Sequence, residues 1–540
     1  MTTIRVLEPQ FDNKGNPSWV TRLSAPDDSY AAINKIPDRI IPVIFVPGVM
    51  GTNLTGQGKS KGLDWLLDSE ISMSAWLFRG PTIRKRHLTP STMRVLDTGM
   101  MAEGTPIPAE ELKRRGWGEV SFMSYGKTLP WLEHALNDFQ APETGERAAL
   151  RKSVLNALVG EAPLTDDEYE LSYRYRFPVY ACGYNWLDSN AVASLRLSQC
   201  IDAVIQRYRK AKQRCEKVII VTHSMGGLVA RHCSEVRGCR DKIFGIVHGV
   251  MPATGAAAVY RRFKAGTEGD YVASEVLGND AAEMTAVLSS APGPLQLLPS
   301  AEYGNGWLKI KDGAYEHSLP RNGDPYGEIY TVRGKWWSMC EDQLINPLNI
   351  ETNQKKKQTQ IDSDWSTFVD IIKEDVRRFH ESIRGRYHPN TYAFSGIDPM
   401  SPAYGTVAWR GGDLFGNARP TDVMNRPALT SEVLARQNMP APEIKGARTV
   451  KGKFTDGGWF SRFERTYFIS EPDEPGDGTV PQRSGRAVRQ TSRSYAEMRV
   501  GHEPAYQFQK GGEYERACRF TLRAIVKIAQ EAQKTSLRYD

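Results

Sequence analysis

The sequence predicts an α/β fold built on a mostly parallel β-sheet with helices on both faces. Short, apolar, β-branched segments recur along the chain, and segments with helical periodicity alternate with them. A long stretch of mixed character interrupts this alternation and predicts an inserted lid. With 540 residues, 40% of them hydrophobic and 25% charged, the chain can bury a sizeable core.

The regular part of the alternation lies in the first 250 residues. Four buried strands are expected, at 40–46, 178–183, 217–221 and 242–250. A long amphipathic helix is expected at 190–213, and a second helix should begin at Gly226, soon after the third strand. Strands separated by helices pair in parallel, so these segments predict one sheet.

The remaining strands of the sheet come much later in the chain. Segments 391–396 and 495–500 are predicted as strands, and a terminal helix is predicted near 514–534. Between the two strands, 404–470 is rich in glycine and aromatic residues and predicts hairpins. The predicted organisation is an N-terminal extension (1–36), a first core part (37–250), a lid insertion (251–389), a core strand (390–397), a second insertion (398–470) and the end of the core (471–540).

Composition excludes several classes of protein. No apolar stretch is long enough to predict a membrane-spanning helix, and the first residues lack the apolar region of a secretory signal, which predicts synthesis in the cytoplasm. Seven cysteines without a C-x-x-C pair predict reduced thiols. The net charge is +7, and basic clusters such as 84–86, 209–212 and 355–357 predict solvated faces, with attraction to anionic lipid as the alternative. No nucleic-acid motif occurs.

The stretch "KVIIVTHSMGGLVAR", residues 217–231, contains the candidate nucleophile, Ser224. A buried strand runs into Thr-His-Ser-Met-Gly and then into a helix, which is the setting that a nucleophile elbow requires. Thr222 stands where a glycine is usual, which weakens the match. The alternative is an ordinary turn from a strand into a helix.

A serine hydroxyl needs a histidine to take its proton and a carboxylate to orient that histidine. In this architecture the acid and then the histidine follow the serine along the chain. Of nine histidines only His502 lies beyond residue 388, directly after a predicted strand, so it is the candidate base. Asp477 in "EPGDGTVP" is the candidate acid, with Asp473 and Glu474 as rivals. The alternatives are a surface-loop histidine and a plain Asp-Gly hairpin turn.

The oxyanion of an acyl-transfer intermediate needs two backbone N–H groups. One is expected from Met225, the residue after the nucleophile, and the other from the loop "PGVMG" (47–51) after the first strand. Within that loop Val49 is the preferred donor and Met50 the near alternative. A glycine turn without a catalytic role is the competing interpretation.

Other conspicuous residues are interpreted as packing residues. His223 and His248 lack a ligand-like partner spacing, so they are expected to pack rather than to bind a metal. Trp336–Trp337 and the segment 65–67 are expected to pack in the lid, with lipid contact as the alternative. No metal or cofactor is expected.

Six segments together resemble the lipase branch of the α/β-hydrolases, which includes lecithin:cholesterol acyltransferase-like and GPI inositol-deacylase-like esterases. They are "VIFVPGVMGTNL", "YNWLDSN", "THSMGGLVAR", "APGPLQLLP", "GDGTVP" and "GHE". They lie within 40–300 and 470–505, about half of the chain. Among bacterial proteins, the sequence looks most like the phospholipase effectors of type VI secretion systems.

The resemblance implies attack on a lipid acyl ester, an oxyanion amide at Val49, an acid at Asp477 and a lid over an apolar trough. It also implies transient contact with a phospholipid membrane surface. Export by a type VI system to target-cell membranes would bring a cognate immunity protein and a spike or adaptor protein as partners. The rival hypotheses are an esterase or acyltransferase for another ester, and a non-catalytic module that binds lipid or a partner.

Overall fold

The fold is described from a computed structural model of the chain. It describes all residues except 1–2, 8–9, 13–16, 21–28, 33–35, 70–71, 73–75, 77, 140–141, 152, 154–156, 161, 269–275, 277, 314, 412–423, 425–445, 454–461 and 540. Much of the predicted second insertion, 398–470, therefore lies outside the described residues.

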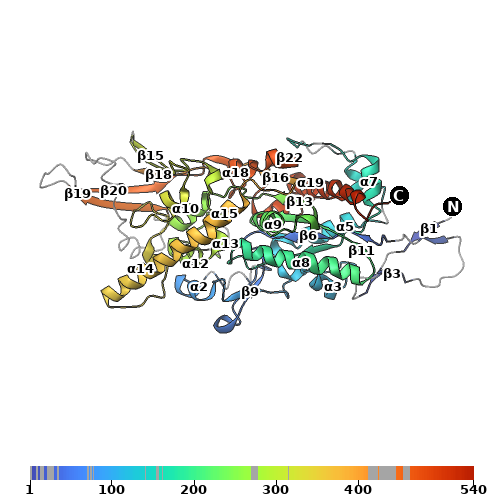
Figure 1. The fold of residues 1–540 in the computed structure, drawn as a ribbon, viewed down its shortest axis with the longest axis horizontal. Coiled ribbons are helices and arrows are strands. Elements are labelled where there is room, and N and C mark those ends of the chain that lie inside the picture. Colours follow the sequence, from blue (N-terminus) through green and yellow to red (C-terminus); the bar gives the residue numbers. More distant parts are fainter. Residues whose placement is uncertain are drawn as a thin grey trace.

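A six-stranded parallel sheet forms the centre of the molecule and confirms the predicted fold class (Figure 1). All of its neighbouring strands pair in parallel. In spatial order the strands are β10 (Val179–Ala181), β6 (Val43–Val46), β12 (Val218–His223), β13 (Ile243–Gly249), β16 (Thr391–Gly396) and β22 (Ser492–Met498). Each lies within or close to a segment predicted as a strand, because buried parallel strands are recognisable as short apolar β-branched runs.

Helices cover both faces of this sheet, as predicted. In β6, Ile44 and Val46 belong to the apolar cluster that contains α8 (Asn190–Lys210) and α9 (Gly226–Glu235). Val43 and Phe45 face the opposite cluster, which contains α5 (Thr128–Leu136) and α19 (Gly512–Ala529). Successive strand residues point to opposite faces, so every residue of β6 is buried.

The prediction of a single strand at 40–46 is wrong in one respect, because this segment is divided between two short strands. β5 (Arg39–Ile40) pairs with β11 (Arg214–Cys215), and β6 starts at Val43 in the central sheet. Pro42 separates them, and proline has no N–H to donate to a ladder. The predicted terminal helix is α19 followed by a 3₁₀ turn over Gln530–Lys534.

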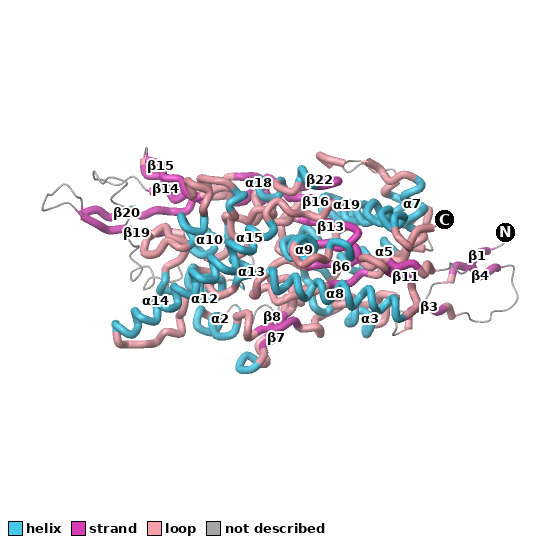
Figure 2. Tube along the Cα trace, viewed as in Figure 1, coloured by secondary structure: helices cyan, strands magenta, loops and turns pink. Residues whose placement is uncertain are grey.

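A second, five-stranded sheet lies at the end of the molecule opposite the N-terminus (Figure 2). Its strands, in spatial order, are β15 (Tyr315–Leu319), β14 (Leu308–Asp312), β18 (Val407–Gly411), β20 (Arg462–Ile469) and β19 (Ala447–Lys453). Only the pieces around β18 and β20 were predicted, as hairpins, and these two strands do pair antiparallel. We call the described residues of 251–389 and 398–470 the cap.

The cap also contains several helices. They are α10 (Ala258–Ala265), α12 (Ala281–Leu288), α14 (Gln354–Asp370) and α15 (Arg378–Ile383). The polar run at 351–360 forms the exposed start of α14, where the Asn353 side chain accepts hydrogen bonds from the N–H groups of Lys355 and Lys356. Asparagine is a preferred N-cap residue, so this start is locally encoded.

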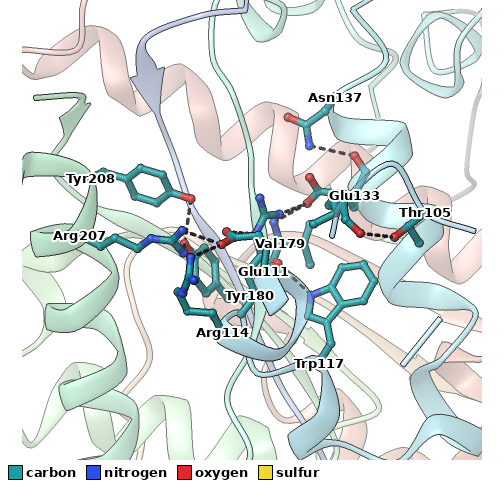
Figure 3. Close-up of polar contacts among 12 residues, drawn as sticks. Thr105, Glu111, Arg114, Trp117, Glu133, Asn137, Val179, Tyr180, Arg207 and Tyr208 are labelled. Carbon is teal, nitrogen blue, oxygen red and sulfur yellow. Dashed lines mark hydrogen bonds and ion pairs between the residues drawn. The ribbon is translucent and has the colours of Figure 1, made fainter. Parts of the chain in front are cut away.

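A network of buried charges lies beside the edge strand β10, where Arg207 donates to the hydroxyl of Tyr180 (Figure 3). Glu111 accepts hydrogen bonds from Arg114, Arg115 and Arg207, which joins α3 (Ala109–Arg114) to α8. Burial alone would raise the pKa of Glu111, but the hydrogen bonds from Arg207 and Arg115 lower it below its usual value. The carboxylate therefore stays charged and satisfied in the interior.

None of the described helices combines the length and apolar composition that a bilayer span needs. Within the described part of the chain, no three histidine, cysteine, aspartate or glutamate side chains gather closely enough to hold a metal ion. All seven cysteines are free thiols.

Candidate active site

Ser224 lies at the sharp turn between β12 and α9, in the position of an elbow nucleophile. Its φ is +52°, in the left-handed region that non-glycine residues rarely adopt, and its N–H donates to the carbonyl of Gly249 at 3.0 Å. A Cβ added at Gly226 would lie 2.5 Å from the carbonyl oxygens of Val46 and Pro47. The end of β6 therefore packs so closely against the start of α9 that the turn needs a glycine here.

Thr222, the unusual first residue of the elbow, has a partner of its own. Its hydroxyl lies 2.9 Å from Nδ1 of His248 on the neighbouring strand β13, and both side chains are fully buried. Burial lowers the pKa of His248 to about 3, so this ring is neutral. The buried hydroxyl of this threonine thus has a hydrogen-bond partner on the neighbouring strand.

The structure brings the three predicted triad residues together. The Ser224 hydroxyl lies 2.8 Å from Nε2 of His502, and Nδ1 of His502 lies 2.9 Å from Oδ2 of Asp477. The carboxylate faces Nδ1, so Nδ1 carries the hydrogen and Nε2 is free to accept the serine proton. Ser224 and Asp477 are 3% exposed, and the His502 side chain is 15% exposed, so the base is the member of the trio that meets the cavity most openly.

Asp477 is held by its own loop. Its Oδ1 accepts hydrogen bonds from the N–H groups of Thr479, at 3.0 Å, and Val480, at 2.7 Å. Its backbone carbonyl accepts from the N–H of His502 at 2.8 Å, which links the acid loop to the histidine loop. A Cβ on Gly396, the last residue of β16, would lie 2.5 Å from the Asp477 Cβ, so this glycine lets the acid approach the sheet.

The two rival carboxylates have other partners. Asp473 accepts a hydrogen bond from the N–H of Thr406 at 2.8 Å. Glu474 binds Arg483 through both the backbone N–H and the side chain. Neither is hydrogen-bonded to His502 among the described contacts, so the geometry favours Asp477.

The predicted oxyanion donors lie beside the nucleophile. Val49, Met50 and Ser224 line the same cavity, and Met225 follows Ser224 directly. Within the described residues, the N–H groups of Val49, Met50 and Met225 donate to no protein acceptor, whereas the N–H of Gly48 donates to the Tyr125 hydroxyl at 3.1 Å. Both the preferred donor Val49 and its alternative Met50 therefore have an N–H available for an oxyanion.

Sequence reasoning missed a hydrogen-bonded chain behind the triad. The Tyr125 hydroxyl, which accepts from Gly48, lies 2.7 Å from Nδ1 of His223, and Nε2–H of His223 donates to the carbonyl of His502 at 2.8 Å. A carbonyl only accepts, so Nε2 of His223 carries the hydrogen and Nδ1 accepts from Tyr125. Burial and the nearby His502 lower the pKa of His223 to about 3, which keeps it neutral.

His223 is thus more than the packing residue that the sequence indicated. It is buried, as predicted, but it joins the candidate oxyanion loop to the backbone of the candidate base. Its place next to Ser224 was a signal, whereas its partner Tyr125 comes from a helical segment about 100 residues earlier, where no pattern marks it.

Trp336 and Trp337 are buried in the cap, as predicted, whereas Trp65, also predicted to pack in the lid, is buried within the first core part. Trp336 is fully buried and stacks on Tyr467, with ring centroids 4.3 Å apart, and Trp337 is 7% exposed. Trp65 is 1% exposed and packs on Trp186. From the segment 65–67, Leu67 reaches the cavity in front of Ser224.

A cavity of about 290 Å³ opens in front of Ser224 and His502. Most of its lining is apolar, from Val49, Met50, Leu67, Pro252, Ala256, Val259, Val276, Met284, Leu288, Pro294, Leu297 and Val480. The polar side chains on it include Ser124, Arg262, Thr267, Glu268, Thr479 and Glu503. An apolar cavity with a few polar groups beside an activated serine is suited to a substrate with a hydrocarbon chain and a reactive ester.

Comparisons with known proteins agree with this geometry. The PGAP1-like alpha/beta domain matches residues 190–264, which run from α8 through the Ser224 turn into α10. Among solved structures, the chain is similar to one described as "the crystal structure of Tle4-Tli4 complex", with 27% identity and a TM-score of 0.71. That match covers 91% of this chain and 98% of the other.

A second structure, phospholipase PlaB from Legionella pneumophila in complex with thio-NAD, is 11% identical and has a TM-score of 0.15. The match covers 56% of this chain and 83% of the other. No curated protein matches the sequence. The PGAP1-like and Tle4 matches confirm the α/β-hydrolase fold and the predicted resemblance to the lipase branch and its type VI phospholipase effectors, and they support a lipase-type hydrolase.

Proposed function

We propose that this protein is a serine phospholipase of the A type, which hydrolyses acyl esters of membrane phospholipids. The observation that carries the proposal is the hydrogen-bonded series Ser224–His502–Asp477 opening into an apolar cavity. The resemblance to a Tle4 structure over nearly the whole chain supports it. Each step of the reaction follows from groups already in place, without a metal or cofactor.

In the first half of the reaction, Ser224 Oγ attacks the ester carbonyl carbon while Nε2 of His502 takes its proton. Asp477 holds the resulting imidazolium and stabilises its charge. The carbonyl oxygen becomes an oxyanion, which accepts hydrogen bonds from the N–H groups of Val49 and Met225. When the C–O bond breaks, His502 returns the proton to the leaving alcohol, which is the lysophospholipid, and the acyl group stays on Ser224.

In the second half, water replaces the alcohol. His502 takes a proton from a water molecule while the water oxygen attacks the acyl carbon. The same two amides donate hydrogen bonds to the second oxyanion. The bond to Ser224 Oγ breaks, the proton passes to that oxygen, and a fatty acid leaves. The apolar lining from α10 and α12 holds the acyl chain during both halves.

The biological setting belongs to the same proposal. We infer that the protein is an antibacterial effector, exported by a type VI system through a spike or adaptor protein to act transiently on target-cell membranes. The Tle4–Tli4 structure is a complex of two proteins, which supports a cognate immunity protein for this chain as well. Such a partner would protect the producing cell by covering the cavity or holding the cap.

Mass spectrometry of products from mixed bacterial phospholipids tests the enzymatic proposal. Wild type should release fatty acid and lysophospholipid, and Ser224→Ala should release neither while unfolding at the same temperature. A fluorophosphonate probe should label Ser224 in the wild type only. Intact lipids with a labelled serine would indicate an esterase or acyltransferase for another ester, and a serine that is never labelled would indicate a binding module.

A further inference from the structure

The cavity in front of Ser224 carries one opposite-charge pair on its apolar lining. Among the described residues that line it, Arg262 is the only arginine or lysine, and Glu268 lies beside it. The Nε–H of Arg262, on α10, donates to Oε2 of Glu268 at 2.8 Å. Both side chains are partly exposed, 20% for Arg262 and 23% for Glu268, so the pair remains reachable from the cavity.

Arg262 is also tied to the loop that holds the candidate acid. One of its terminal nitrogens, Nη2, donates to the Thr479 hydroxyl at 3.2 Å, and the N–H of Thr479 donates to Oδ1 of Asp477 at 3.0 Å. Two short contacts, both through Thr479, therefore connect this guanidinium to the triad. Its place relative to Ser224 is set by the same loop that sets the acid, although it belongs to the cap.

Glu268 has spare capacity to accept hydrogen bonds. Its Oε1 is shielded from solvent and has no hydrogen-bond partner among the described residues, and the Nε of Arg261 lies 3.8 Å from it. A second carboxylate on the cavity lining belongs to Glu503, next to His502. The cavity thus offers one guanidinium and two carboxylates, which suits a ligand with both a negative and a positive group.

We propose that Arg262 and Glu268 select phospholipids with a zwitterionic ethanolamine headgroup at this site. The guanidinium binds the phosphate oxygens of the substrate, since its planar fork matches an oxyanion. Glu268 then loses its arginine partner, and the substrate ammonium takes that place on the carboxylate. The inference rests on the proposed phospholipase function and assigns its headgroup class.

The same charges disfavour other headgroups. A glycerol headgroup brings a phosphate but no cation, so it would draw Arg262 away and leave Glu268 without its closest cationic partner, with Arg261 at 3.8 Å as the remaining one. A choline headgroup has no N–H to donate to the carboxylate, and quaternary ammonium groups are bound best by several aromatic rings. Tyr125 is the only tyrosine, tryptophan or phenylalanine among the described lining residues.

The test compares turnover of three substrates by the full-length protein. They are phosphatidylethanolamine and phosphatidylglycerol with identical acyl chains, each at the same mole fraction in neutral-detergent micelles, and an uncharged p-nitrophenyl ester. Dilution in a neutral micelle at about 0.15 M salt limits general attraction of the basic protein to anionic lipid. Wild type should cleave the ethanolamine lipid roughly tenfold faster than the glycerol lipid, as for a loss of about one charge-assisted contact.

Two variants of the pair should then change different ratios. Arg262→Gln should lower the ratio of ethanolamine-lipid to p-nitrophenyl-ester turnover about tenfold, and Arg262→Lys should recover part of it because the charge remains. Glu268→Gln should bring the ethanolamine-to-glycerol ratio to within about twofold of one. The matched control is Arg261→Gln on the same helix. Arg261 also faces Glu268 but does not line the cavity, so both ratios should stay at the wild-type values.

The outcomes separate this inference from the function on which it rests. Equal wild-type turnover of the two phospholipids, or equal effects of Arg262→Gln and Arg261→Gln, would overturn headgroup selection and leave a phospholipase. Wild type that cleaves the p-nitrophenyl ester and neither phospholipid would overturn the proposed function, and this inference with it. Unfolding temperatures measured for each variant identify any that lose turnover because they do not fold.

Discussion

The two walls of the cavity differ in how the chain builds them. One wall comes from the ends of central-sheet strands and nearby core loops, and it holds Ser224, His502 and Val49. The other comes from the cap, mainly residues 252–297, and it holds Val259 and Arg262. In the proposed reaction, the first wall carries the groups that react and the second carries the groups that surround the substrate. Changes in the first wall should therefore affect all esters alike, whereas the effect of changes in the second wall should depend on the ester.

The largest expected effect is at the acid of the reacting wall. Asp477→Asn should lower kcat for every ester by about 10³- to 10⁴-fold, because an amide favours the wrong tautomer of His502. Initial rates on a short-chain and a long-chain ester measure it. The matched control is Asp473→Asn, four residues earlier, which should retain kcat to within about threefold. A large loss of kcat from Asp473→Asn, without one from Asp477→Asn, would assign the role of the acid to Asp473.

The next effect is a loss of folding stability at acidic pH, which we expect to arise mainly from histidines in the central sheet and its helices. Burial lowers the pKa of His223 and His248 to about 3 and that of His232 and His380 to about 4. The unfolded chain titrates near the ordinary value of about 6.5, so it binds more protons than the folded chain between these limits. The contribution of these histidines to the free energy of unfolding is therefore fully present above about pH 6.5. It is lost as the pH falls, by up to about 1.4 kcal/mol per pH unit for each histidine.

Urea unfolding between pH 7.5 and 5 checks this slope. His248→Gln should flatten the dependence by about one proton, and the exposed His134→Gln should leave it unchanged. Three of the four histidines lie on β12, β13 and α9, and one lies on α15 in the cap. A slope that depends only on His380 would therefore show that the acid sensitivity comes from the cap and not from the central sheet.

A change in the cap wall should be selective. Val259→Trp on α10 would fill part of the apolar cavity, and we expect the ratio of long-chain to short-chain ester turnover to fall about tenfold. Turnover of p-nitrophenyl butyrate and p-nitrophenyl palmitate measures the ratio. Val236→Trp, at a 39% exposed position after α9, is the control. Equal loss on both esters would show that this wall also sets the chemistry.

An effect of similar size tests the hydrogen-bonded chain behind the triad. Tyr125→Phe leaves the N–H of Gly48 and Nδ1 of His223 without their partner, so kcat for a short ester should fall about tenfold while KM stays within about twofold. Tyr506→Phe is the control, since its ring also packs on His223 but its hydroxyl faces Thr521. A fall in stability without a fall in kcat would reduce Tyr125 to a packing residue.

Sequence patterns located the reacting wall because its parts are local. A buried strand, a glycine-rich turn and a polar residue in sequence are enough to place Ser224, Asp477 and Val49. The break at Pro42 and the extra strands of the cap were missed. Strands such as β14 and β15 carry charged and polar residues on a half-exposed hairpin, so their pattern is weaker than that of a buried parallel strand.

The sequence by itself determined the order of the chemistry and the fold class, since strand, turn and helix preferences act over a few neighbouring residues. Only the tertiary structure decided what surrounds that chemistry. Tyr125 and His223 are 98 residues apart in the chain, and Arg262 and Thr479 are 217 apart. Such contacts form when the central sheet and the cap pack together, and no local preference specifies them. The same reason explains why the candidate nucleophile could be predicted at Ser224 from the sequence, whereas the proposed headgroup preference depends on contacts in the cap.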